Sequence, residues 1–287
     1  MLQDTFEFSS SFAGPRLAVT ILMHGDESCG LAVLDTVRAE DFALSSGSLV
    51  VLVLNRRAHE APEGPVRHLG TDMNRIWSHT GLGERTEEAR RVASTLPCLK
   101  DADAILDIHS MPSQDTPFLF VSETHPHSAD LAEKLGAAVP RVVTAPPPQQ
   151  RGMALFETEL LPKEMPIVVV ECGQHQSAQA PAVARATFLR FLSVHGMIET
   201  SGDDQTASRE TVRFYEMCRE IKLEQGPLTL ARPMRGFDRL DRGETYGGDG
   251  PRPLIAEEDC HVLLTRPAVN PGDEALTLVR MTRTRHA

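Results

Sequence analysis

The stretch Leu17-Ala-Val-Thr-Ile-Leu-Met23, followed at once by His24-Gly-Asp-Glu27, indicates how this chain folds. Its first part is a nearly continuous apolar run, which is typical of a β-strand covered on both faces. From about Ser28 to Asp41 the apolar residues recur at helical spacing. A buried strand that leads through a polar turn into a helix is the repeating unit of an α/β protein.

The same alternation continues to about residue 195. Further apolar runs predict strands at Leu49–Leu54, Ala104–Ile108, Phe118–Val121 and Ile167–Val170. Helical spacing returns from about Thr86 to Leu96 and from Ala178 to His195. We therefore predict an α/β fold with a largely parallel or mixed sheet flanked by helices.

The composition changes near the polar stretch Glu199–Ser208, which is typical of a linker. Beyond Thr211, short strand patterns alternate with Gly- and Pro-containing turns such as Gly247-Gly248 and Pro271-Gly272. We predict two domains, residues 1–198 and a small β-rich domain at 199–287.

The charge of the chain argues against some partners. Asp and Glu total 40 against 29 Lys and Arg, a formal net charge of -11, which repels nucleic-acid phosphates. Aromatic residues make up only 5% of the chain, so a base-stacking platform is not expected. No apolar run approaches the roughly 20 residues that span a bilayer, so no membrane partner is expected either.

The N-terminus and the cysteines indicate the compartment. The first residues lack a positive region followed by an apolar one, so they do not predict a secretory signal. The cysteines number 5 and are scattered without a CxxC pair, which fits a reducing environment. We expect a cytoplasmic protein, and the sequence leaves a homo-oligomer open.

Four polar residues occupy equivalent places, each at or just after the end of a predicted strand: His24, Asn55, His109 and Glu171. In open α/β sheets, ligands bind outside the carboxyl ends of the strands. We therefore expect these four side chains to converge on one crevice.

His24, Glu27 and His109 have the chemistry of a zinc site. Imidazole nitrogens and carboxylate oxygens are normal zinc ligands, and a catalytic zinc keeps three protein ligands and one open position. Asp72 and Asp107 are candidate hydrogen-bond partners for the other ring nitrogens. Each ligand also has a simpler interpretation: Glu27 could complement a helix dipole, and His109 could be a hydrogen-bonded core histidine.

Glu171 directly follows the buried run Ile167–Val170, where a carboxylate is costly to desolvate. Such a place raises the pKa of a carboxyl towards neutrality, which suits a general base, although the residue could simply emerge into solvent. Arg67, Asn74 and Arg75 offer a guanidinium fork and an amide for a substrate carboxylate, or else form ion pairs in a surface loop.

Taken together, these pieces resemble the succinylglutamate desuccinylase/aspartoacylase family of the zinc carboxypeptidase superfamily. The matching segments appear in the family's order across most of residues 15–195: His24–Glu27, Asn55–Ala58, Arg67 with Asp72–Arg75, Asp107–Ser110 and Val170–Gly173. The resemblance implies a carboxypeptidase-like mixed sheet flanked by helices and followed by a small β-rich C-terminal domain.

The resemblance also implies roles. His24, Glu27 and His109 match the zinc ligands, one Zn²⁺ per chain, and Asp72 matches the partner of the first zinc histidine. Glu171 matches the catalytic glutamate, with Arg67 polarising the scissile carbonyl. The residues that match substrate-binding positions are Arg67, Asn74 and Arg75.

Two positions depart from the family pattern. Asp26 stands where the usual motif has Asn, which should matter little for metal binding. The C-terminal domain of aspartoacylases contributes a Tyr to the pocket, whereas here the corresponding stretch offers His261. Strict N-acetylaspartate specificity is therefore not expected.

The expected activity is zinc-dependent hydrolysis of an N-acylated amino acid or a similar small anionic amide. A carboxypeptidase-type peptidase is an alternative. It is weakened because such a pocket commonly has a Tyr from the catalytic domain, whereas Tyr215 and Tyr246 both lie beyond the linker. A non-catalytic metabolite-binding module is a second alternative, weakened because Glu171 and all three ligands are retained.

Overall fold

One mixed sheet organises the chain. The computed structural model describes residues 3–113, 116–147, 152–199, 211–266 and 268–286. Within these residues the main sheet has 11 strands. In spatial order they are β1 (Thr5–Ser9), β3 (Ser48–Val53), β2 (Arg16–Ile21), β4 (Ala104–Met111), β7 (Ile167–Gln174), β5 (Phe118–Ser122), β6 (Arg141–Ala145), β8 (Thr211–Lys222), β14 (Glu274–His286), β13 (Cys260–Leu263) and β10 (Arg239–Leu240).

The predicted strands are present, and their apolar runs form the centre of the sheet. Strands β3, β2, β4 and β7 run parallel to one another, and β5 pairs antiparallel with β7. Their side chains are buried on both faces, which is why these segments lack the alternation of a half-exposed strand. Because the four parallel strands share a direction, their carboxyl ends lie at the same edge of the sheet.

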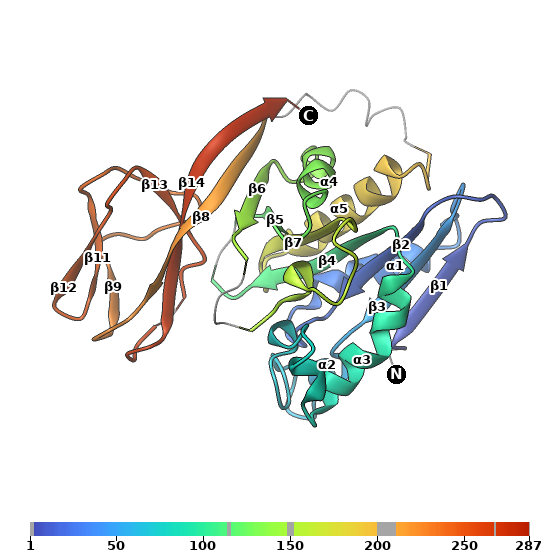
Figure 1. Ribbon diagram of the computed structural model, residues 1–287, viewed down its shortest axis with the longest axis horizontal. Helices are drawn as coiled ribbons and strands as arrows, with labels where there is room; N and C mark the ends of the chain where they lie inside the picture. Colours follow the sequence, from blue (N-terminus) through green and yellow to red (C-terminus); the bar gives the residue numbers. More distant parts are fainter. Residues whose placement is uncertain (1–2, 114–115, 148–151, 200–210, 267, 287) are drawn as a thin grey trace.

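Helices cover both faces of the sheet (Figure 1). Helices α1 (Leu31–Val37), α4 (Ser128–Leu135) and α5 (Ala180–Val194) share one hydrophobic core with the strands, and α3 (Glu87–Lys100) packs in the core of the opposite face. The helices predicted from spacing are therefore present. The first is shorter than expected, because the chain turns after Val37, where the Phe42 N–H bonds the Ala39 carbonyl.

Helix α3 begins where the sequence indicates. The side chain of Thr86 accepts a hydrogen bond from the Ala89 N–H at 3.2 Å, which satisfies one of the unpaired donors at the helix start. Glu87 and Glu88 stand in the first turn, where the helix dipole favours negative charge.

The C-terminal part is rich in β-structure, as expected. It carries a 3-stranded sheet of β12 (Arg252–Ile255), β11 (Thr245–Asp249) and β9 (Leu228–Leu230), at the left of Figure 1. It also has a hydrophobic cluster of its own, which includes Leu240, Tyr246 and Val262.

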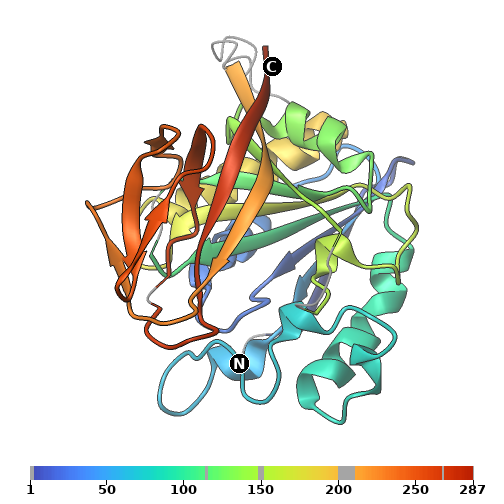
Figure 2. The same ribbon diagram turned by 60° about the vertical axis from the view of Figure 1, so that its left-hand side comes forward.

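The C-terminal strands are also joined to the main sheet. Strand β8 pairs parallel with β6, and β14 pairs antiparallel with β8 (Figure 2). The predicted linker Glu199–Ser208 lies outside the described residues from residue 200 on, so the division at 198/199 stays a prediction.

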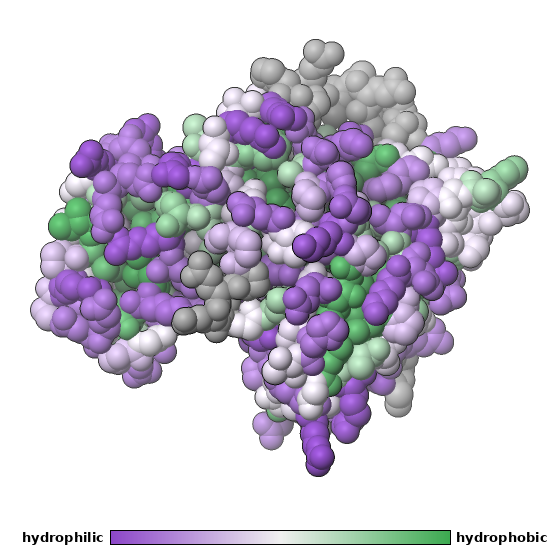
Figure 3. All heavy atoms as spheres, viewed as in Figure 1, coloured by the Kyte–Doolittle hydropathy of each residue, from purple (hydrophilic) through white to green (hydrophobic). Residues whose placement is uncertain are grey.

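The surface seen in Figure 3 is mainly hydrophilic, with apolar residues in small, separate patches. Among the residues that the structure describes, no helix combines the length and apolar character needed to span a membrane.

Candidate active site

His24 and Glu27 stand on the turn that leaves β2. Leu22, fully buried at the start of this turn, adopts a left-handed φ of 54°, a conformation that costs a non-glycine residue about 1–2 kcal/mol. Gly25 is closely enclosed, since a Cβ there would lie 2.4 Å from the Ala58 carbonyl carbon and 2.5 Å from the Val66 oxygen. The turn therefore requires glycine between the two side chains.

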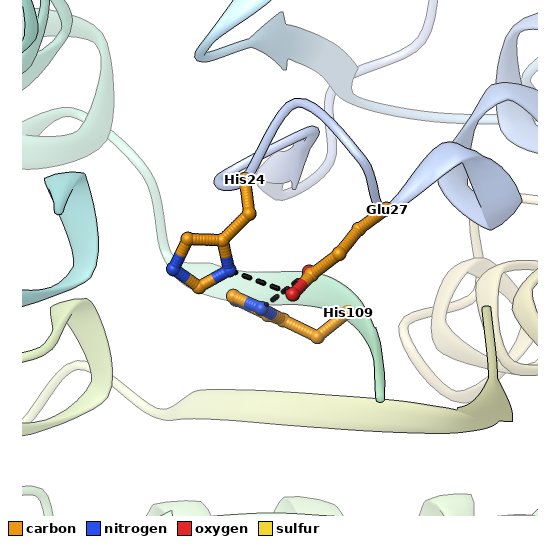
Figure 4. A group of neighbouring side chains, drawn as sticks. All are labelled: His24, Glu27 and His109. Atoms are coloured by element: carbon orange, nitrogen blue, oxygen red, sulfur yellow. Dashed lines mark hydrogen bonds and ion pairs between the residues drawn. The ribbon is translucent and has the colours of Figure 1, made fainter. Parts of the chain in front are cut away.

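His24, Glu27 and His109 converge although His109 comes from a different element, β4 (Figure 4). The His24 Nδ1 lies 2.7 Å from Glu27 Oε1, and the His109 Nδ1 lies 2.8 Å from Glu27 Oε2. All three side chains are buried, and their ligand atoms lie within 4.8 Å of one another. The three residues could therefore hold one metal ion.

Each histidine has a carboxylate on its outer nitrogen. The His24 Nε2 lies 3.0 Å from Asp72 Oδ1, and the His109 Nε2 lies 2.9 Å from Asp107 Oδ2. Asp107 is itself held by the Thr20 hydroxyl, which donates to Oδ1 at 2.6 Å. Because a carboxylate only accepts, each Nε2 donates and each Nδ1 is the atom turned towards Glu27.

The arrangement of the Nδ1 atoms fits a divalent cation. Two bare lone pairs cannot face carboxylate oxygens at these distances without repulsion, so protons or a cation must lie between them. Burial opposes the charged form of both histidines, but nearby carboxylates outweigh this effect and raise the pKa of each. Glu27 acts on His24, and Asp107 and Glu27 act on His109. One divalent cation would replace the two protons at the same total charge.

Glu171 lies beside this group on the neighbouring strand β7, directly opposite His109 in the β4–β7 register. Its Oε2 is inaccessible to solvent and accepts no hydrogen bond from any described residue. Burial raises the pKa of Glu171 to about 7; the positive charge of protonated His109 opposes the rise, and the negative charge of Glu27 adds to it. A carboxyl with this pKa can exchange a proton near neutral pH.

Arg67, Asn74 and Arg75 reach the same cavity from the segment that follows β3. Arg67 donates to Asp72 Oδ2 from Nη2 at 2.9 Å, so the carboxylate on His24 also holds this guanidinium. The Asn74 N–H bonds Asp72 Oδ1 at 2.9 Å, and the Arg75 Nη1 donates to the Asn74 carbonyl at 2.8 Å. Asp72 thus ties the positive segment to the candidate metal group.

A cavity of about 450 Å³ joins these residues to the C-terminal part. Every residue named above as a candidate ligand, base or anchor lines it, and Met217, Glu220, Arg266 and Glu274 close its far side. Met217 and Glu220 belong to β8 and Glu274 to β14, so the strands added to the main sheet also complete the cavity.

Comparison with known proteins identifies the fold. A structure described as succinylglutamate desuccinylase/aspartoacylase from Rhodobacter sphaeroides is similar with a TM-score of 0.73 and 19% identity, covering 95% of this chain and 87% of that one. The product-bound ectoine utilization protein EutE (DoeB) from Ruegeria pomeroyi has a TM-score of 0.73 and 18% identity over 96% and 88% of the two chains. A succinylglutamate desuccinylase from Vibrio parahaemolyticus has a TM-score of 0.71 and 16% identity, covering 98% of this chain and 87% of that one.

The sequence itself decides the family, although comparison with curated proteins gave no match. Residues 13–193 match the Succinylglutamate desuccinylase/Aspartoacylase catalytic domain. The chain belongs to the succinylglutamate desuccinylase/aspartoacylase family. Members of this family are hydrolases that act on acylated amino acids, so the expected resemblance and the hydrolase class are both confirmed.

Two expected members of the crevice lie elsewhere. Asn55 precedes the short helix α2 (Arg56–His59) and lines a separate hollow of about 80 Å³. His261 on β13 packs its ring against Tyr215 with centroids 5.4 Å apart and is not among the residues that line the cavity. The C-terminal part instead contributes Arg266, which comes after β13 has ended and so can turn into the cavity.

Arg266 was not predicted because no family motif marks it. It pairs with Glu274, and burial, with the nearby charges of Arg75 and Arg67, lowers the pKa of its guanidinium. The only sequence signal was its position a few residues after His261.

His175 lies next to the candidate metal group of His24, Glu27 and His109. Asp26, Glu27 and His175 form a second set of possible ligands that shares Glu27 with the first. The His175 Nδ1 lies 2.8 Å from the Ser110 hydroxyl. The set centred on His24 and His109 fits better, because each of its histidines is oriented by a carboxylate on the other nitrogen.

Glu88 positions the segment that bears Arg67 and Asp72. It is buried, and its Oε1 accepts hydrogen bonds from the Leu69 and Gly70 N–H groups, both at 3.0 Å. Burial opposes the charge of Glu88, but these backbone donors outweigh it and lower the pKa. The carboxylate therefore fixes the backbone that lies between the two cavity residues.

Glu88→Ala is expected to lower kcat/KM about 10- to 100-fold, because Arg67 and Asp72 lose their fixed position. Glu87→Ala, at the exposed neighbour that pairs with Arg57, is the matched control and should leave kcat/KM unchanged. Activity on acylated amino acids and the thermal midpoint are measured for both variants. Equal activities of the two variants would refute the positioning role.

Proposed function

We propose that this protein is a zinc-dependent amidohydrolase that removes the acyl group from an N-acylated amino acid or a similar small anionic amide. The observation that carries the proposal is the pair of histidines whose Nδ1 atoms face Glu27, with the raised-pKa carboxyl of Glu171 on the adjacent strand. His24, Glu27 and His109 would hold the zinc.

When bound, zinc would polarise the scissile carbonyl and lower the pKa of water at its open position to about 7. Glu171 takes the proton from the attacking water and delivers it to the leaving amine. The raised pKa of Glu171 suits both transfers, because a group that titrates near the working pH can accept and return a proton.

Arg67 stabilises the negative charge that develops on the carbonyl oxygen, a contribution that is often the largest single one in amide hydrolysis. Its guanidinium is held in place by Asp72. Asn74 and Arg75 bind the substrate carboxylate, through an amide and a planar guanidinium fork respectively.

A deacylation screen tests the proposal. The purified protein is assayed on N-acetyl, N-succinyl and N-formyl amino acids and on short peptides, with zinc content measured in the same sample. We expect the protein to release free amino acid from N-acyl substrates and to contain about one zinc per chain, since the three candidate ligands form a single catalytic zinc site. A zinc-loaded sample that cleaves only peptides, or nothing, would contradict it.

A further inference from the structure

The cavity beside the candidate metal group has an apolar wall. Six of its lining side chains are apolar and of the size of valine or larger: Met111, Phe120, Phe156, Val169, Met217 and Leu264. They come from both parts of the chain, with Met217 on β8 and Leu264 just beyond β13. An apolar lining packs against an apolar part of the ligand, whereas the polar groups fix the ligand's orientation.

The apolar wall lies on the same side as the proposed carboxylate anchor. The Asn74 Oδ1 accepts a hydrogen bond from the Leu155 N–H at 3.3 Å, so Asn74 abuts the residue that precedes Phe156. The rings of Phe156 and Phe120 then lie 4.8 Å apart. We therefore expect a substrate whose carboxylate reaches Asn74 to place its neighbouring side chain close to these rings.

The wall also continues from the proposed base. Val169 precedes Glu171 by two residues on β7, so both side chains point to the same face of the sheet. Val169 is the register partner of Phe120 on β5. The Glu171 carboxyl, where the scissile bond of a substrate would lie, is therefore on the same face of the sheet as the apolar wall.

The charged residues of the far side offer no net positive charge. Arg266 is paired with Glu274, and Glu220 adds a further negative charge to the same wall. On the near side, Arg67 is matched by Asp72, and Arg75 meets the one substrate carboxylate that the proposed function places there. A second substrate carboxylate placed beyond the apolar wall would approach Glu220 and Glu274.

We propose that the substrate is an N-acylated amino acid with an apolar side chain, aliphatic or aromatic, which packs on Phe120, Phe156 and Met217. The proposal rests on the deacylase function proposed above and names its substrate class. The cavity of about 450 Å³ is in the usual range for sites that enclose a whole small molecule, so it has room for such a side chain.

The experiment compares N-acetyl-L-leucine and N-acetyl-L-phenylalanine with N-acetyl-L-aspartate and N-acetyl-L-glutamate on the zinc-loaded, full-length protein. We expect kcat/KM to be at least about tenfold higher for the apolar pair, since burying such a side chain gives discrimination of this order. Met217→Lys is expected to shift the ratio at least about tenfold towards N-acetyl-L-aspartate, because it places a cation in the apolar wall.

Met281→Lys is the matched control, since Met281 is an exposed methionine on the adjacent strand β14 that does not line the cavity. It should leave the ratio unchanged. Met217→Gln, a milder change, should shift the ratio in the same direction as Met217→Lys and serves if the lysine variant fails to fold.

The outcomes separate the two proposals. A preference for the apolar substrates that Met217 variants weaken supports the inference. A preference for N-acetyl-L-aspartate, or a ratio that Met217 variants leave unchanged, overturns the inference and leaves the deacylase function standing. Absence of hydrolysis of every N-acyl amino acid by the zinc-loaded protein overturns the deacylase function itself.

Discussion

Glu171→Gln is expected to lower kcat about 10²- to 10⁴-fold while zinc content stays unchanged. The amide has the size of the carboxylate but cannot accept the proton of the attacking water, and general base catalysis contributes a factor of this order. Zinc should remain because the three candidate ligands, His24, Glu27 and His109, are untouched. Steady-state kinetics and metal analysis of one preparation measure both quantities.

Glu164→Gln is the matched control for this variant. Glu164 is an exposed glutamate on the loop before β7, where its side chain pairs with the exposed His127. Glu164→Gln changes the charge in the same way as Glu171→Gln, but Glu164 does not line the cavity. The kcat of this control should therefore equal that of the wild type. Near-full turnover of zinc-loaded Glu171→Gln would remove Glu171 from the proton transfer.

The same residue predicts a pH dependence. Glu171 must be ionised to accept a proton, so activity is present above its pKa and is lost as the pH falls through it. Burial raises that pKa to about 7 against the opposing charges of His109 and His24, and one divalent cation in place of the two histidine protons would leave the total charge beside Glu171 unchanged.

We therefore expect an acid limb in kcat/KM with an apparent pKa of about 7, and a loss of about tenfold per pH unit beneath it. Zinc content must be followed over the same range, because protonation of the histidines would also abolish activity. An acid limb that appears only where zinc is released would show that the ligands, and not Glu171, set it.

Much of the sheet was predictable because its central strands carry an unusually clear signal. The runs at Leu17–Met23 and Ile167–Val170 are buried on both faces, and only a covered strand tolerates such continuous apolarity. The carboxyl ends of parallel strands share an edge, which is why His24 and His109 could be expected to meet although they are 85 residues apart in the sequence (109 minus 24).

The far side of the cavity was not predictable from the sequence. Met217 and Glu220 reach it only because β8 pairs with β6, for example Val142 with Phe214. No local pattern in either strand specifies that pairing, since the apolar residues of β6 (5 residues) and β8 (12 residues) do not select each other over another strand. A single sequence therefore indicates the proposed catalytic groups better than the surface that would select the substrate.

The difference between His261 and Arg266 has a related cause. His261 lies within β13, paired with Val279 of β14, and its ring is taken up by the contact with Tyr215. Arg266 lies beyond the end of the strand, where its direction is set by the loop and by Glu274. Sequence position alone could not distinguish which of the two faces the cavity.

Loss of either candidate ligand histidine is expected to abolish zinc binding. His24→Ala and His109→Ala should each retain less than about a tenth of the zinc of the wild type after dialysis, because each removes one of only three protein ligands. Activity should fall with the metal. The alternative that these are merely core histidines predicts a change in stability with no change in zinc content.

Two further measurements separate a metal site from a buried ionic cluster. Zinc that binds only the native state stabilises it by RT ln(1 + [Zn²⁺]/Kd), so the thermal midpoint rises with the logarithm of free zinc above Kd. Added zinc should therefore stabilise the wild type and not His109→Ala. Asp72→Asn and Asp107→Asn should weaken zinc affinity about 10- to 100-fold, since each amide still contacts its histidine but no longer supplies a charge. His127→Ala removes an exposed histidine that pairs with Glu164, so this control should keep the full zinc content. If the control also lost its zinc, the loss would come from the preparation of the protein and not from the missing ligand.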